Sequence, residues 1–221
     1  AALEAGAHGI TVHPRPDERH IRPADVAEIA SLLHEPAWRG REFNIEGNPF
    51  EGRYVDHCRR VRPTQCTLVP DTPGQSTSDH GWPLDAATIT RLRPIVRDLA
   101  TLGCRVSLFV DADAATVARA AETGCARVEL YTEPYAAAYD AGAAARERAL
   151  ERFAAAAEAA HATGLGVNAG HDLTAENLGP FLQRVPHVEE VSIGHALVAD
   201  ALTLGMAGAV QLYLRALSPR P

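Results

Sequence analysis

GITVHPRPDERHI, residues 9–21, is a short apolar run that passes directly into a basic loop. Ile10-Thr11-Val12 is β-branched and typical of a buried strand. Pro14 cannot continue a central strand, so we expect a loop to begin there. The groups that titrate or carry positive charge in this loop are His13, Arg15, Arg19 and His20. Because α/β proteins place their active sites at the carboxyl ends of buried strands, the stretch predicts an α/β fold with its site here.

Outward from this stretch, strand-like and helix-like segments alternate along the whole chain. Strands are predicted at residues 10–12, 42–46, 65–69, 105–110, 127–131, 166–169 and 189–193. Helices are predicted at residues 23–33, 50–60, 84–102, 143–162, 175–185 and 196–217, with another from a cap at Asp111 or Asp113 to Thr123. Residues 71–83 and 132–140 are predicted as long loops. This alternation implies a parallel sheet covered by helices.

The count of these units decides between two sheet architectures. Seven strand–helix units follow residues 1–7, which resemble the last turn of an earlier helix capped by Gly6. We therefore expect a (β/α)₈ TIM barrel that apparently lacks its first strand in this chain. Residues 1–221 would form a single TIM-barrel domain without the N-terminal strand and most of the first helix. An open doubly wound sheet is the alternative, disfavoured because no G-x-G-x-x-G follows a strand.

Composition limits the function classes. The chain has 221 residues, a net charge of −7 and 46% hydrophobic residues, so it can bury a sizeable core. The acidic balance argues against nucleic-acid or membrane-surface binding, although a local basic cluster can still attract an anionic substrate. Cys58, Cys66, Cys104 and Cys125 form no C-x-x-C pair and predict buried free thiols in a reducing cytoplasm. No apolar run in the sequence has the length of a membrane span.

Four predicted strand ends carry residues that suit acid–base chemistry. They are His13, Glu46, Gly170-His171 and Gly194-His195. A lone histidine at a strand end is more often structural, but three on one rim favour a functional site. Glu46 could face solvent, or it could act as a general base. The two glycine–histidine pairs follow the last strands, where barrels often bind phosphate. Asp111-Ala112-Asp113 could bind a metal, but a helix cap is favoured.

From residues alone, we predict a cytoplasmic barrel enzyme that acts on a small phosphorylated substrate. Several longer motifs then resemble the pyridoxine 5′-phosphate synthase family of vitamin B6 biosynthesis. They lie at residues 9–21, Asn44-Ile45-Glu46, Leu68-Val69-Pro70, residues 107–113, Val167-Asn168-Ala169-Gly170-His171 and Ile193-Gly194-His195-Ala196. Each motif alone is weak, but their shared order along nearly the whole chain is specific.

The resemblance implies a reaction and a set of site residues. The family condenses 3-amino-2-oxopropyl phosphate with 1-deoxy-D-xylulose 5-phosphate, giving pyridoxine 5′-phosphate, phosphate and water, without a metal or organic cofactor. By resemblance, His13 and Glu46 would be proton acceptors and His171 the proton donor. The residues implied to bind the deoxyxylulose phosphate are Arg15, His20 and Thr77; those implied to bind the other substrate are Asp172 through its backbone N–H, Gly194 and His195. A homo-oligomer, commonly an octamer, is also implied.

Two other functions remain open at this stage. A metal-dependent barrel hydrolase or aldolase would use His13, Glu46, His171 and His195 as ligands. An inactive truncated fragment would associate only through its alanine-rich helices. The side chain of Asp172 would repel phosphate unless it turned away to cap the following helix.

Overall fold

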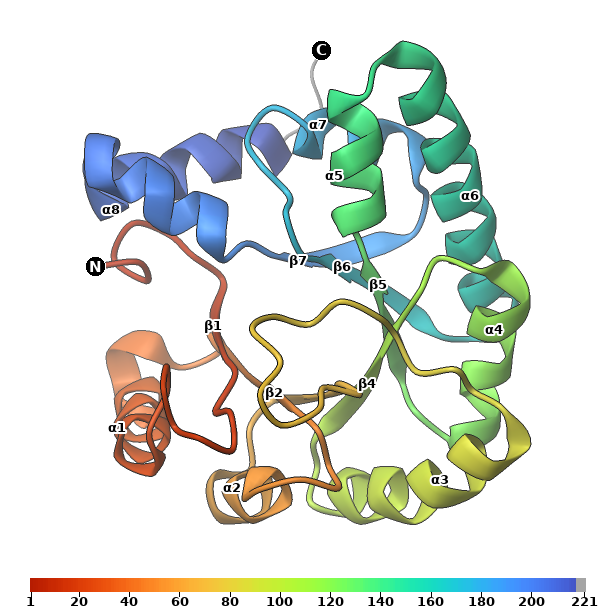
Figure 1. The fold of residues 1–221 in the computed structure, drawn as a ribbon. Coiled ribbons are helices and arrows are strands. Elements are labelled where there is room, and N and C mark those ends of the chain that lie inside the picture. Colours follow the sequence, from red (N-terminus) through yellow and green to blue (C-terminus); the bar gives the residue numbers. More distant parts are fainter. Residues whose placement is uncertain (218–221) are drawn as a thin grey trace.

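The computed structural model describes residues 1–217 as a curved, all-parallel sheet surrounded by helices (Figure 1). Its strands pair in chain order from β1 to β7. They are β1 (Gly9–Val12), β2 (Glu42–Gly47), β3 (Gln65–Leu68), β4 (Arg105–Val110), β5 (Arg127–Tyr131), β6 (Gly166–Gly170) and β7 (Val188–Ser192). In the described residues β7 does not pair with β1, so the ring is open between them. The expected barrel-type α/β fold is confirmed as a seven-stranded, open TIM-barrel-like sheet.

Except for α5, the helices lie where the sequence predicts them, with shifts of a few residues at the ends. They are α1 (Pro23–His34), α2 (Tyr54–Val61), α3 (Ala86–Thr101), α4 (Ala114–Arg119), α5 (Glu133–Asp140), α6 (Ala143–Ala162), α7 (Leu178–Arg184) and α8 (His195–Leu217), with 3₁₀ turns at Pro36–Trp38 and Ala120–Thr123. The carboxylate of Asp113 caps α4 by accepting the Thr116 N–H at 2.8 Å. This is the structural role favoured above for the Asp111-Ala112-Asp113 motif.

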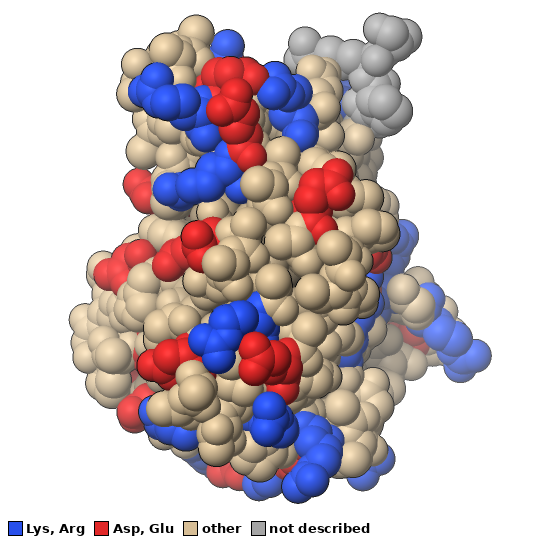
Figure 2. Space-filling model, turned by 90° about the vertical axis from the view of Figure 1, so that its right-hand side faces the viewer, with Lys and Arg blue, Asp and Glu red and all other residues tan. Residues whose placement is uncertain are grey.

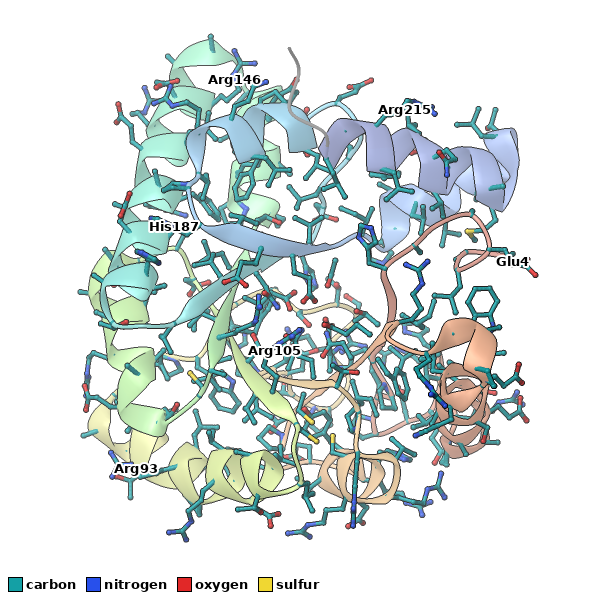
Figure 3. All side chains as sticks on the ribbon, turned by 180° about the vertical axis from the view of Figure 1, so that it is seen from behind. Glu4, Arg93, Arg105, Arg146, His187 and Arg215 are labelled. Atoms are coloured by element: carbon teal, nitrogen blue, oxygen red, sulfur yellow. The ribbon has the colours of Figure 1, made fainter. Side chains whose placement is uncertain are left out.

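Alternation along the strands separates an apolar outer face from a polar interior. In β4, Val106, Leu108 and Val110 are buried in the main hydrophobic core, which contains side chains of the surrounding helices. Arg105, directly before Val106, points to the other face and reaches Glu42, Gln65 and Glu190 on other strands, and Figure 3 shows it within the ring of strands. Because strand side chains alternate between faces, each strand contributes to both layers. The interior is therefore polar and the core lies outside the sheet.

One predicted loop is a helix. Residues 132–140 form α5, because Pro134 suits a first helical turn and Tyr135 anchors the segment. The Tyr135 side chain is fully buried, its ring lies 5.0 Å from that of Phe181, and its hydroxyl donates to Asn177 O at 2.8 Å. These partners lie more than 40 residues away in sequence, so local turn signals could not reveal them.

Contrary to the expectation that no apolar run has the length of a membrane span, helix α8 is long and apolar enough, by length and composition alone, to cross a membrane. Its backbone is not helical at Gly205, where φ is 71° and ψ is 158°. Each part on either side is shorter than the ~20 residues that a membrane-spanning helix needs.

On the opposite side of the molecule, around α4 and α6, acidic and basic side chains are interspersed on the surface (Figure 2).

The strand starts form a polar network beside a cavity of about 640 Å³ between β1 and β7. Arg105 contacts Glu42 at 2.5 Å and Glu190 at 3.0 Å, and Gln65 donates to Glu190 at 3.0 Å. Burial, with the nearby carboxylate of Glu42, raises the pKa of Glu190 to about 7. Folding therefore favours the protonated form of Glu190.

Replacing Glu190 with Gln should reduce the pH dependence of stability. Between pH ~4.5 and ~7 folded Glu190 holds more protons than the unfolded residue does, so its contribution destabilises the fold increasingly as pH rises. In the variant, we expect the change in unfolding free energy between pH ~4.5 and ~7 to be smaller by about 1–3 kcal/mol. Urea denaturation at several pH values measures it. Glu189→Gln, at the exposed neighbouring residue, is the control, and equal slopes for Glu190→Gln and the unchanged protein would contradict the expectation.

Candidate active site

His13 lies between two carboxylates at the carboxyl ends of β1, β2 and β3. Its Nδ1 is 3.7 Å from Glu46 Oε2, and its Nε2 is 3.6 Å from Asp71 Oδ2. His13 follows β1 directly, Glu46 is near the end of β2, and Asp71 lies just beyond the end of β3. The parallel register of these strands brings the three groups to one rim. The separations are longer than hydrogen bonds, as is common for catalytic groups before substrate binds.

Asp71 joins this candidate site, although the sequence did not predict it. Its Oδ2 accepts from Arg15 Nη1 at 2.7 Å and from Ser78 Oγ at 2.8 Å. Its carbonyl oxygen accepts from Asn48 Nδ2 at 2.7 Å. Asp71 thus links the loop after β1 to the β3–α3 loop, residues 69–85. The signal was present in the sequence, because Asp71 follows the Leu68-Val69-Pro70 motif at the end of a predicted strand.

His171 faces the same rim from the end of β6. Its ring packs against Phe109, at a centroid distance of 5.1 Å, and against Tyr131, at 5.5 Å. Burial lowers the pKa of His171, and the carboxylates of Glu46, Asp172 and Asp71 partly oppose this shift. These charges act on His171 because they are close to it. The structure therefore brings His171 together with the groups around His13, and a lowered pKa makes its protonated form a stronger acid.

Glu129, on β5, is a second residue that the sequence analysis missed. It is 1% exposed, and neither carboxylate oxygen has a hydrogen-bond partner among the described residues. Burial, reinforced by the charges of Glu46 and Glu190, raises its pKa well above the ordinary value. A methyl group on Gly170 would lie only 2.3 Å from Glu129 Oε1, so this carboxyl packs directly against the backbone next to His171. Its sequence signal is the inward position between Val128 and Leu130.

The residues predicted to bind the first phosphate occupy different surroundings. Arg15 is buried and paired with Asp71, Thr77 is half-buried in the β3–α3 loop, and His20 is exposed. Arg19, which the resemblance does not include, donates to Gln75 O at 2.5 Å and to Ser76 O at 3.2 Å. A cavity of about 60 Å³ lies between these two loops, lined by Arg15, Arg19 and Asp71 among others.

The residues predicted for the second phosphate lie beyond β6 and β7. Gly194 directly precedes α8, and nothing lies within 4 Å of where its Cβ would be. His195 begins α8 with 82% of its side chain exposed, and its Nδ1 is 3.9 Å from Asp172 Oδ1. A helix N-terminus with an open glycine suits an anion. Asp172 does not cap the following helix as suggested, because α7 begins at Leu178 after Asn177.

Comparison with known proteins assigns the chain to a family. A family described as "Pyridoxal phosphate biosynthesis protein PdxJ" matches residues 1–219. A pyridoxine 5′-phosphate synthase of Albidiferax ferrireducens is 56% identical, covering 98% of this chain and 85% of that protein. One of Mesorhizobium japonicum is 54% identical, covering 97% and 86%. The chain belongs to the PdxJ family of pyridoxine 5′-phosphate synthases. The resemblance inferred from sequence motifs is thereby confirmed.

Solved structures agree with the PdxJ family assignment at the level of fold. A 3-keto-L-gulonate-6-phosphate decarboxylase of Vibrio cholerae has a TM-score of 0.61 at 10% identity, covering all of this chain and 89% of that one. At this identity only the fold is shared. The metal-dependent alternative has no support from the PdxJ assignment, and residues 1–217 contain no group of three His, Cys, Asp or Glu side chains arranged to hold a metal ion.

Proposed function

We propose that the rim around His13 condenses 3-amino-2-oxopropyl phosphate with 1-deoxy-D-xylulose 5-phosphate, the reaction implied by the family motifs. His13 and Glu46 accept protons and His171 donates one. The observation that carries this proposal is the position of His13 between two carboxylates, 3.7 Å from Glu46 and 3.6 Å from Asp71. Imine formation, dehydration and ring closure all require proton transfers, and adjacent bases and acids provide them.

The two proposed phosphate sites fit substrates that each carry one phosphate. Arg15 and Thr77 belong to the loops that meet over β1 and β3, and His20 lies farther out on the first of these loops. Gly194 and His195 stand at the start of α8, with the backbone of Asp172 beside them. In this arrangement the acid–base residues His13, Glu46 and His171 lie at the carboxyl ends of the strands, and the two proposed phosphate sites lie on either side of them. Arg15 would exchange part of its pairing with Asp71 for the phosphate.

Glu129 contributes a neutral carboxylic acid beneath this site. Because burial raises its pKa well above the ordinary value, the group keeps its proton at pH values at which an exposed carboxyl is ionised. A protonated carboxyl can donate a hydrogen bond to developing negative charge, which an ionised one cannot. We therefore add Glu129 to the proposed site as a hydrogen-bond donor next to His171.

Replacing Glu46 with Gln tests the proposed base. The amide keeps the shape of the side chain and its contact with Asn44, at 3.4 Å, but it cannot accept a proton. We expect the rate of pyridoxine 5′-phosphate formation to fall about 10²–10⁴-fold. Glu28→Gln, on the exposed surface of α1, is the control and should retain full activity. An active Glu46→Gln protein would remove Glu46 from the proposed mechanism.

Three expectations from the resemblance stay predictions. These are the homo-oligomer, commonly an octamer, the cytoplasmic location and the absence of a cofactor. The acidic net charge of −7 supports small-molecule substrates rather than nucleic acid as partners.

A further inference from the structure

His171 and Asp172 adopt a backbone conformation that residues other than glycine rarely take. Their φ angles are 85° for His171 and 55° for Asp172, both in the left-handed region. Each such non-glycine residue stores of order 1–3 kcal/mol, so it persists only where its surroundings hold it. Gly170, just before them, has its Cα against the carboxyl of Glu129. The loop that carries the proposed proton donor is therefore under strain.

Thr132 holds this strained loop. It follows β5 directly and is fully buried. Its N–H donates to Gly170 O at 2.9 Å, and its hydroxyl donates to the same oxygen at 2.7 Å. The hydroxyl also contacts the carbonyl oxygen of His171. A threonine has only one hydroxyl hydrogen, so it is shared between two successive carbonyls at the point where the left-handed turn begins.

The His171 ring is held separately from its backbone. Phe109 and Tyr131 lie against it, and with Val69 they form a small apolar cluster distinct from the main core. These rings limit where the imidazole can tilt, but they do not set the peptide planes before and after it. Thr132 therefore holds the carbonyl groups of Gly170 and His171, Asn177 Nδ2 donates to the next carbonyl oxygen, that of Asp172, at 3.2 Å, and the aromatic rings hold the His171 side chain.

We propose that the hydroxyl of Thr132 is a positioning group for His171, holding its backbone in the left-handed conformation that directs the imidazole at the site. This inference rests on the proposed function, in which His171 donates a proton. Thr132 does not touch the reacting atoms in this arrangement. It acts by keeping the imidazole in place, and misplacing a catalytic group by about 1 Å can cost ~10²-fold in rate.

Thr132→Val and Thr132→Ser separate the hydroxyl from the rest of the side chain. Valine keeps the branched shape but has no hydroxyl, whereas serine keeps the hydroxyl and lacks the methyl group. We expect Thr132→Val to lower kcat about 10–100-fold, with KM for both substrates changed less than about twofold. Thr132→Ser should stay within about threefold of the unchanged enzyme. If Thr132→Val folds poorly, Thr132→Ala removes the hydroxyl with less crowding.

The titration of His171 provides a second readout that a merely structural role would not move. Its pKa is lowered by burial, while Glu46, Asp172 and Asp71 raise it and His13 lowers it. If the loop loosens, the imidazole gains water, and its pKa should move up towards the ordinary value near 6.5. NMR titration of the His171 ring, assigned with His171→Asn, measures this in each variant. We expect an upward move in Thr132→Val and none in Thr132→Ser.

Two results would overturn the inference. One is a Thr132→Val enzyme with unchanged kcat and an unchanged His171 titration. The other is a Thr132→Ser enzyme as impaired as Thr132→Val, because the hydroxyl would then not be the group responsible. An active His171→Asn enzyme would instead overturn the proposed role of His171 itself. Loss of activity in His171→Asn with normal Thr132→Val would overturn only the positioning role.

Discussion

Replacing His171 with Asn should abolish formation of pyridoxine 5′-phosphate while leaving the protein folded. Asparagine tolerates the left-handed backbone better than most residues, so the φ of 85° at this position is retained at little cost. Its amide cannot deliver the proton that the imidazole supplies. We expect a fall in kcat of at least ~10²–10⁴-fold. Steady-state assays measure the rate, and circular dichroism with thermal unfolding checks the fold.

The matched control for this substitution is His161→Asn. His161 is an exposed histidine on α6, where its ring stacks on that of His187 at 3.8 Å. Figure 3 shows His187 at the edge of the molecule, away from the ring of strands. His161→Asn should therefore keep full activity. Full turnover by His171→Asn would be incompatible with His171 as the proton donor, and joint loss of fold and activity would make it a structural residue.

Replacing Gly81 with Ala should strongly destabilise the fold. A Cβ there would lie 2.3 Å from Asp111 N and 2.4 Å from Val110 Cα, and these backbone atoms of β4 and its end cannot rotate away. The glycine N–H donates to Asp111 Oδ1 at 3.1 Å, and the next residue, Trp82, donates to Phe109 O at 2.9 Å. The β3–α3 loop is thus fastened to β4 here. We expect a loss of about 3 kcal/mol in unfolding free energy, measured by urea denaturation.

Gly74→Ala is the control within the same loop. Gly74 has a φ of 86°, but nothing lies within 4 Å of its Cβ position. Alanine there meets backbone strain without a clash, so we expect a loss of only about 1 kcal/mol. Equal losses for the two variants would show that close packing on β4 is not what requires Gly81. We also expect any folded Gly81→Ala protein to lose activity, because the displaced loop carries Asp71 and Thr77.

Most of the fold could be predicted because its signals are local. β-branched and apolar runs ended by proline or glycine mark β1, β3 and β6, and helical spacing marks α1 and α3. The same proline and glycine signals predicted that His13, Glu46 and His171 lie near strand ends. Parallel strands carry such ends to one rim whatever the details of packing. The structure brings these three side chains to one rim, and their roles in catalysis stay a prediction.

The residues that the prediction missed depend on contacts between distant segments. Asp71 joins the candidate site because Arg15, 56 positions away, donates to it and His13 lies 3.6 Å from it. The pKa of Glu129 is raised because the side chains around it exclude water and bring the charge of Glu46 near. The helix α5 forms because Tyr135 reaches Phe181 and Asn177. No spacing within a single segment reveals any of these partners.

The sequence by itself determined the alternating strand–helix order, the family motifs and the rim that carries His13, Glu46 and His171, because these depend on local propensity and chain direction. Tertiary structure alone decided the burial, the pairing and the backbone conformation of those groups. It partly buries His171, pairs Arg15 with Asp71 and places Thr132 against the strained turn. The physical reason is that desolvation and hydrogen-bond geometry depend on groups that meet only after the sheet has curved.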